Sequence, residues 1–151
     1  EWFQEQTEAY AKKFAAALLK KDVKSASKIL NDLLFTSISY FDYDEKFYHG
    51  ILIGLLCNYR IMSNQESGLG RFDIAVAPRS LSDRGMILEL KTANSLAELK
   101  NTAKHACKQI KDKQYIEGKL AEGYEDIIGY GIAFYKKFCV IEALEDSTST
   151  M

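Results

Sequence analysis

Apolar residues at the start of the chain recur every three to four positions, the spacing of one face of an α-helix. This stripe predicts a helix from Trp2 to about Lys20. Its members are Phe3, Thr7, Tyr10, Phe14 and Ala17. Asp22 is a residue type that caps helix N-termini, and the apolar positions after it predict a second helix through Leu34. We expect residues 1–40 to form a helical hairpin that connects to an upstream domain, with direct binding of a partner as the alternative.

The middle of the chain changes from helical to strand-like spacing. The segment EKFYHGILIGLLCNY is apolar around most of its circumference and predicts a largely buried helix, capped by Asp42 or Asp44. Strands are predicted over residues 59–66 and over the segments RFDIAVA and MILELK. The polar, glycine- and proline-containing stretches 67–70 and 78–85 predict the turns between them.

The last third of the chain completes an α/β pattern. Asn94 can cap a long helix over residues 95–118, and two apolar strands follow at 127–135 and 137–144. Residues 147–151 predict a polar tail. Two helices followed by the order α-β-β-β-α-β-β predict a mixed sheet flanked by helices.

The two strands around the 78–85 turn bring three charged residues onto one face. Successive side chains of a strand point to opposite faces, so Phe72 and Ile74 should face one way and Asp73 the other. In MILELK the same alternation separates Glu89 and Lys91 from the leucines. If the strands pair antiparallel with their apolar faces on one core, Asp73, Glu89 and Lys91 emerge together on the opposite face.

Two carboxylates beside an ammonium group point to phosphodiester chemistry. Carboxylate oxygens are ligands that Mg²⁺ accepts, and Mg²⁺ typically takes one or two of them together with waters and substrate phosphates. A neighbouring lysine can hold a water and offset the charge of a phosphoryl group. The pattern therefore indicates metal-assisted hydrolysis. A buried ion-pair network without a ligand is the alternative.

Asp73, followed after the turn by Glu89-Leu90-Lys91, resembles the core motif of the PD-(D/E)XK nuclease superfamily. The chain looks closest to the branch often fused behind an AAA-ATPase-like domain in bacterial proteins. The similar segments are EKFYHGILIGLL, SNQESGLGRFDIAV, ILELK, AKHACKQIKDKQY and GYGIAFYKK. The resemblance implies a restriction-endonuclease-like core (α-β-β-β-α-β) over residues 41–146. It also implies that Asp73, Glu89 and the Leu90 carbonyl hold Mg²⁺ or Mn²⁺ while Lys91 positions the attacking water.

Four other residues are candidates for the same site. Glu45 and His49 stand four residues apart, on one face near the start of the third predicted helix. The resemblance implies that Glu45 completes the metal shell. Alternatively, Glu45 only favours the positive helix N-terminus and His49 is a packing residue. Glu66 is either a further ligand or a turn acid that pairs with Arg71.

The long helix predicted over residues 95–118 has an apolar and a basic face. The apolar positions are Leu96, Leu99, Ala103, Ala106 and Ile110, and the basic positions opposite them are Lys100, Lys104, Lys108 and Lys111. Lysines in such an arc predict sequence-independent contacts to nucleic-acid phosphates. A solvated helix face is the alternative.

Gln109 lies at the border of the apolar stripe. RecB-like relatives carry a glutamine that reaches the active site, so the resemblance implies that Gln109 orients Lys91 or the water. Those relatives usually have the spacing Q-x-x-x-Y, whereas this chain has Lys113 there and its tyrosine at position 115. On a continuous helix Tyr115 points about 120° away from Gln109. We therefore do not expect Tyr115 in the site.

Composition adds limits to this interpretation. A chain of 151 residues suits one domain with a proper core. Its net charge of −1 lacks the basic excess typical of DNA-binding proteins, but six lysines lie between positions 100 and 119. The three cysteines are widely spaced and predict buried free thiols. No signal peptide and no apolar run of about 18 residues is visible, so we expect a cytoplasmic protein without membrane segments.

Together these patterns predict a Mg²⁺- or Mn²⁺-dependent deoxyribonuclease that binds DNA. The chain begins at Glu1 rather than Met, so we expect an ATPase-like domain upstream in a longer protein. A homodimer is an open alternative to a monomer. The competing function is a catalytically inactive nuclease-like module that binds nucleic acid or protein within a larger ATPase.

Overall fold

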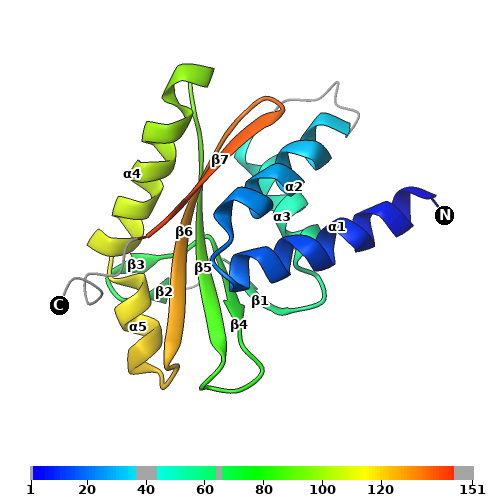
Figure 1. Ribbon diagram of the computed structural model, residues 1–151. Helices are drawn as coiled ribbons and strands as arrows, with labels where there is room; N and C mark the ends of the chain where they lie inside the picture. The colour runs from blue at the N-terminus through cyan, green and yellow to red at the C-terminus, as the bar shows by residue number, and fades with distance from the viewer. Residues whose placement is uncertain (1, 37–43, 64–65, 145–151) are drawn as a thin grey trace.

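A five-stranded mixed sheet forms the centre of the molecule (Figure 1). This computed structural model describes residues 2–36, 44–63 and 66–144. Neighbouring strands are antiparallel except β5 and β6, which are parallel. In their spatial order the strands are β1 (Arg60–Ser63), β4 (Ile74–Ala77), β5 (Arg84–Thr92), β6 (Asp126–Tyr135) and β7 (Phe138–Ala143). The mixed α/β arrangement predicted from the sequence is confirmed.

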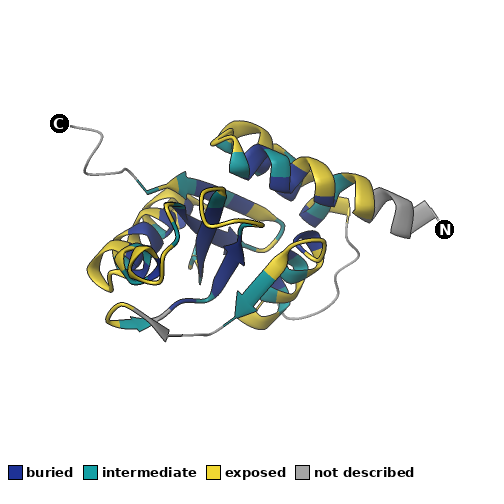
Figure 2. Ribbon diagram, turned by 90° about the horizontal axis from the view of Figure 1, so that it is seen from below, coloured by how far each residue is buried: buried dark blue, intermediate teal, exposed yellow. Residues whose placement is uncertain are grey.

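Helices cover both faces of this sheet (Figure 1). On one side lie α1 (Trp2–Leu19), α2 (Val23–Thr36) and α3 (Glu45–Leu55). On the other lie the short 3-10 helix η1 (Leu96–Glu98), α4 (Leu99–Asp112) and α5 (Tyr115–Ala121). Figure 2 shows the strands as mainly buried between helices whose outer surfaces are exposed.

The first helices share one hydrophobic core with the sheet. Phe14 and Leu18 of α1, together with Leu30 of α2, are fully buried against residues such as Leu88 and Ile132. The boundary expected near residue 40 falls in 37–43, outside the described residues. The polar tail expected at 147–151 lies outside them too. None of the described helices is long and apolar enough to cross a bilayer.

The β4–β5 register follows the predicted alternation, with one exception. Ile74 pairs with Leu88 and faces the first core. The prediction that Phe72 faces the same way is wrong, because Phe72 packs with Ile87 in a second core beneath α4 and α5. The reason is local: β4 begins only at Ile74 and the chain bends at Asp73, so strict alternation does not extend back to Phe72. Both faces of the sheet are buried, rather than one.

The strand predicted over residues 59–66 is two separate elements. β1 ends at Ser63, and β2 (Glu66–Ser67) pairs with β3 (Gly70–Arg71) in a small two-stranded ribbon. The turn of this ribbon docks on the α4–α5 junction, where the Leu69 N–H donates to the Lys113 carbonyl at 2.7 Å. Gly68 has a left-handed φ of 58°, and a Cβ there would fall on the carbonyl oxygen of Gln114.

The helix predicted over residues 95–118 is also divided. α4 ends at Asp112 and α5 begins at Tyr115. Between them Gln114 adopts a left-handed conformation with φ of 55°. The prediction of one continuous helix is therefore wrong. The break changes the direction of Tyr115, which has consequences for the site described below.

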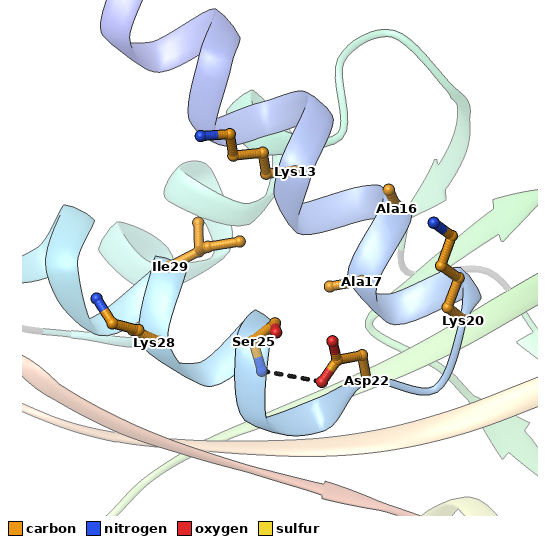
Figure 3. Close-up of a pocket in the computed structure, with 8 residues that line it drawn as sticks. All are labelled: Lys13, Ala16, Ala17, Lys20, Asp22, Ser25, Lys28 and Ile29. Atoms are coloured by element: carbon orange, nitrogen blue, oxygen red, sulfur yellow. Dashed lines mark hydrogen bonds between the residues drawn. The ribbon is translucent and has the colours of Figure 1, made fainter.

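Two of the three predicted helix caps are confirmed. The prediction that Asn94 caps the helix after β5 is wrong, because Ser95 and Glu98 stand at the N-caps of η1 and α4, and neither forms a side-chain cap. Asp22 caps α2: its Oδ1 accepts from the Ser25 N–H at 3.2 Å (Figure 3). Hydrogen bonding to the side chain of Ser25, and then to its backbone N–H, lowers the pKa of the Asp22 carboxyl. Asp44 caps α3 through the Phe47 N–H at 2.9 Å. The alternative cap Asp42 lies outside the described residues.

The cysteines match expectation in part. All three are free thiols, and two of them, Cys107 and Cys139, are buried. The prediction that Cys57 is buried is wrong, because α3 ends at Leu55 and Cys57 lies exposed in the turn that follows.

The ribbon turn provides a stability test. We expect Gly68→Ala to lower the free energy of unfolding by about 2 kcal/mol, because the new Cβ is strained at positive φ and meets the backbone of Gln114. The measurement is urea denaturation. The matched control is Gly50→Ala in α3, where no atom lies within 4 Å of the added carbon and helix propensity should make the change neutral or stabilising. Equal behaviour of the two variants would contradict the docking of the ribbon turn.

Candidate functional site

Two acidic side chains meet where β4 begins. Asp73 directly precedes β4, and continuing the β4–β5 register by one residue places it opposite Glu89. The Asp73 N–H donates to Oε1 of Glu89 at 3.3 Å, and the Leu90 N–H donates to Oδ2 of Asp73 at 2.9 Å. Each carboxyl group is therefore fixed by the backbone of the neighbouring segment.

The electrostatics of this pair are unfavourable without a cation. Glu89 is only 3% exposed. Its burial, together with the nearby charge of Asp73, raises the pKa of Glu89 to about 8, while Lys91 acts in the opposite direction. At neutral pH the pair therefore retains a proton, and a bound cation would relieve the repulsion between the two groups.

Gln109 reaches this pair from α4. Its side-chain amide donates to Oε2 of Glu89, and the same nitrogen lies 3.5 Å from the Tyr115 hydroxyl, which accepts from it. The expectation that Tyr115 points away from Gln109 is wrong, because the chain breaks at Gln114 before α5 begins. Tyr115 is fully buried, with its ring edge-on to Phe72. Burial raises the pKa of its hydroxyl, and the bond from Gln109 opposes that shift.

A glycine on β6 allows Gln109 this reach. Gly131 pairs with Glu89, and a Cβ at Gly131 would fall on the backbone of α4 at Ala103 and Cys107. The helix therefore lies directly on the strand beside Glu89. Sequence reasoning missed Gly131, although a glycine inside an apolar strand is a known signal of close backbone approach.

Glu45 approaches the site from α3. Burial and the charge of Asp73 raise the pKa of Glu45, whereas the charges of Lys91 and His49 lower it. Glu45 therefore lies within electrostatic range of both Asp73 and Lys91. Nε2 of His49 is buried and has no hydrogen-bond partner among the described residues. Within the same residues, no three His, Cys, Asp or Glu side chains form a group that could hold a metal ion.

The remaining candidates occupy the periphery. Glu66 and Arg71 face each other as a backbone pair across the β2–β3 ribbon, and their side chains are not described. The four lysines of the basic arc are all exposed on α4: they are Lys100, Lys104, Lys108 and Lys111. One of them, Lys108, forms an ion pair with Asp112 at 2.5 Å.

A comparison with known protein families identifies the superfamily of the chain. A family model described as the PD-(D/E)XK nuclease superfamily matches residues 43–144, more than half of the chain. The chain belongs to this superfamily. The match begins just before α3 and includes the whole sheet and the acidic pair. No curated protein and no solved structure matched the chain.

The fold and the motif agree with that membership. The mixed sheet between helices is consistent with a restriction-endonuclease-like core. Asp73 and the Glu89-Leu90-Lys91 segment of β5, which resemble the PD-(D/E)XK motif, both lie within the matched residues. The superfamily consists generally of nucleases, so the chain is related to phosphodiesterases.

The donor set suits the divalent metal ions that PD-(D/E)XK nucleases typically use. Asp73 and Glu89 offer carboxylate oxygens from two rigid segments, and one or two carboxylates are what Mg²⁺ usually takes from a protein. Burial and the charge of Asp73 raise the pKa of Glu89, and the charge of Lys91 opposes this shift only in part. These residues therefore fit a divalent ion better than they fit a closed ion-pair network.

This charge balance predicts a pH-dependent stability. The pKa of Glu89 is raised from 4.5 to about 8, so its protonated form stabilises the fold below about pH 4.5 and this contribution is lost as pH rises through 8. In EDTA at pH 9, Glu89→Gln should be more stable than the wild type by on the order of 2 kcal/mol. At pH 4.5 the difference should vanish. The measurement is thermal unfolding as a function of pH.

The control for this series is Glu125→Gln, which removes an exposed acid outside the site. It should follow the wild type at every pH. Mn²⁺ should raise the melting temperature of the wild type at pH 9 but not that of Glu89→Gln. A parallel pH profile for the wild type and Glu89→Gln would refute the charge balance described for the pair.

Proposed function

We propose that this protein is a Mg²⁺- or Mn²⁺-dependent deoxyribonuclease. One observation carries the proposal: the carboxyl groups of Asp73 and Glu89 each accept a hydrogen bond from the backbone of the other's segment, and Lys91 follows two residues later on the same central strand. Membership of the nuclease superfamily supports phosphodiester hydrolysis. DNA as substrate and the identity of the metal are part of the proposal.

Asp73 and Glu89 are the proposed metal ligands, with the Leu90 carbonyl as a third oxygen. A divalent ion at this position would polarise the phosphodiester group and lower the pKa of a bound water. Glu45 is not grouped directly with the pair, so we propose that it completes the shell through a water. His49 lies four residues further along α3 and would support Glu45 from the same face.

Lys91 is proposed to hold the attacking water and to stabilise the negative charge that develops at phosphorus. It is half-buried at the end of β5, two residues after Glu89 and on the same face. Gln109 donates to Glu89, so its proposed role is to fix the orientation of that carboxylate. Tyr115 in turn accepts from Gln109 and limits its rotation.

The exposed lysines of α4 are the proposed contact surface for the DNA backbone. Lys100, Lys104 and Lys111 form no ion pair with any described residue, and Lys108 lies in the same arc. Exposed ammonium groups bind phosphates without reading sequence, which fits a nuclease of broad specificity. Glu66 and Arg71 at the β2–β3 ribbon are proposed accessory residues.

The wider setting is also proposed, and only the sequence supports it. We propose an ATPase-like domain upstream in the full-length chain, a cytoplasmic location and, as an alternative to a monomer, a homodimer. The resemblance to the ATPase-associated branch rests on the segments around α3, β5 and α4. An inactive nuclease-like module remains the competing function and is an outcome of the following assay.

The primary test is cleavage of plasmid and single-stranded DNA with Mg²⁺, Mn²⁺ or EDTA. The wild type should cut only with metal. Asp73→Asn and Lys91→Ala should reduce the rate by at least about 100-fold, because each removes charge stabilisation at the reacting phosphorus or its metal. Lys24→Ala removes an exposed lysine of α2 and should cut normally.

Two results would reject the assignment. One is normal cleavage by Asp73→Asn or Lys91→Ala with an unchanged melting temperature. The other is an absence of cleavage with every metal while DNA is still retained in a gel shift, which would identify the non-catalytic module.

The basic arc predicts a change in salt dependence. Lys100→Ala/Lys104→Ala/Lys111→Ala should weaken duplex binding and make the slope of log K against log salt shallower by about 3, since each phosphate contact contributes about 0.9. The measurement is fluorescence anisotropy at several salt concentrations. The control Lys12→Ala/Lys13→Ala/Lys24→Ala removes the same charge from exposed positions of α1 and α2. Identical slopes for the two triple variants would show that the arc is only a solvated helix face.

A further inference from the structure

A cavity of about 600 Å³ lies at the end of the sheet away from the acidic pair. Its walls come from the end of α1, the start of β1, the end of β4 and the loop that leads into β5. We call it the arginine pocket, and the residues that define it here are Leu19, Tyr59, Arg60, Pro78, Arg79 and Arg84. Its volume lies in the range of small-molecule and cofactor sites.

The arginine pocket is separate from the acidic pair. Arg84 is the first residue of β5, and Glu89 lies five residues further along the same strand. At about 3.3 Å per residue, the two positions are about 17 Å apart. No residue that lines the pocket belongs to the proposed active site.

The pocket has an excess of positive charge and unused donors. Arg84 is held in place: its Nε donates to Asp126 at 3.0 Å and its Nη1 donates to the Leu19 carbonyl at 2.7 Å. These bonds use two of its five N–H groups, and the other three have no acceptor among the described residues. Arg60 and Arg79 are exposed and form no ion pair with any described residue.

A single acid, Asp83, lines the pocket against these three arginines. Asp126 offsets the charge of Arg84 from outside the lining, which leaves the charges of Arg60 and Arg79 in excess of that of Asp83. Guanidinium groups bind phosphate through two parallel hydrogen bonds. Several arginines around one cavity therefore favour a phosphate group over an apolar ligand.

The remaining lining of the pocket is largely apolar and partly aromatic. Val76 and Ala77 are buried beneath it, and Leu19 and Pro78 are half-buried at its surface. The ring of Tyr59 is 36% exposed and borders the cavity. Aromatic side chains provide stacking surfaces for nucleobases. The lining of the pocket thus combines cationic groups with apolar and aromatic groups suited to a flat ring.

We propose that the arginine pocket binds a nucleoside phosphate. Arg60 and Arg79 hold the phosphate beside the fixed guanidinium of Arg84, and the base lies against Tyr59 and Pro78. This chemistry has two sources, a free mononucleotide and the phosphorylated end of a nucleic-acid strand. Binding here does not require cleavage at Asp73 and Glu89, because the two sites share no residue.

A second pocket lies between α1 and α2 and is lined by Lys13, Lys20 and Lys28 (Figure 3). We call it the lysine groove, and it is a weaker candidate for an anion site than the arginine pocket. There Lys28 is paired with Asp32, and the carboxylate of Asp22 lies among the lining residues. It also lacks an aromatic residue in its lining.

The test is isothermal titration of the full chain in EDTA with adenosine monophosphate, adenosine and inorganic phosphate. The monophosphate should bind at least tenfold more tightly than either adenosine or phosphate alone. Arg60→Ala/Arg79→Ala should weaken monophosphate binding at least tenfold, and Tyr59→Ala should weaken it while leaving phosphate binding unchanged. Both arginines and Tyr59 are exposed, so circular dichroism should show folded variants.

Two controls complete this experiment. Lys12→Ala/Lys24→Ala removes the same charge as the arginine variant from exposed positions outside the pocket, and it should bind the monophosphate normally. Lys91→Ala should also bind normally. If the wild type binds the monophosphate but cleaves no DNA with any metal, the proposed function alone is rejected, so the two proposals fail separately.

Three outcomes would overturn the pocket proposal. They are no monophosphate binding by the wild type, undiminished binding by the arginine variant, and an equal loss in the Lys12→Ala/Lys24→Ala control. A short oligonucleotide with and without a terminal phosphate then identifies the source. Binding at least tenfold tighter than the mononucleotide, and dependent on the terminal phosphate, assigns the pocket to strand ends; otherwise it is assigned to free nucleotides.

Discussion

The close approach of α4 to β6 at Gly131 is the constraint on which the acidic site depends. Any side-chain carbon at Gly131 would overlap the backbone of α4, so the helix and the strand are in direct contact beside Glu89. Protein interiors are packed too densely for such a contact to shift freely. The hydrogen bond from Gln109 to Glu89 is therefore set by the position of two backbones more than by a choice of side-chain rotamer.

The fixed position of Glu89 is electrostatically unfavourable for its carboxylate. The fold fixes Glu89 on a central strand whose two faces are covered by different cores, a place where its negative charge is poorly solvated. Apolar packing on either side, such as Leu88 in one core and Ile87 in the other, holds the strand there. Groups held in an unfavourable protonation state by the surrounding fold are typical of functional sites.

Local patterns were sufficient to predict the centre of the site but not its surroundings. Strand alternation and a polar loop placed Asp73 opposite Glu89, because both signals lie within a short stretch of sequence. The direction of the Phe72 side chain depends on a bend at Asp73. No glycine or proline at that position predicts the bend. The arginine pocket was not predicted because Arg60, Arg79 and Arg84 come from three different segments that only the sheet brings together. Glu45 and the basic arc were predicted as candidates from helical spacing, which places residues on a common face.

The left-handed residue between α4 and α5 affects how this chain should be aligned with its relatives. On a continuous helix, the position beside Gln109 would belong to residue 113, four residues later. The break at Gln114 gives that place to Tyr115 instead, whose hydroxyl lies 3.5 Å from the Gln109 amide. Tyr115 therefore makes, two positions later in sequence, the contact that a continuous helix would give to residue 113. An alignment that opens a two-residue gap at this point would follow the chain more faithfully than one that records the tyrosine as lost.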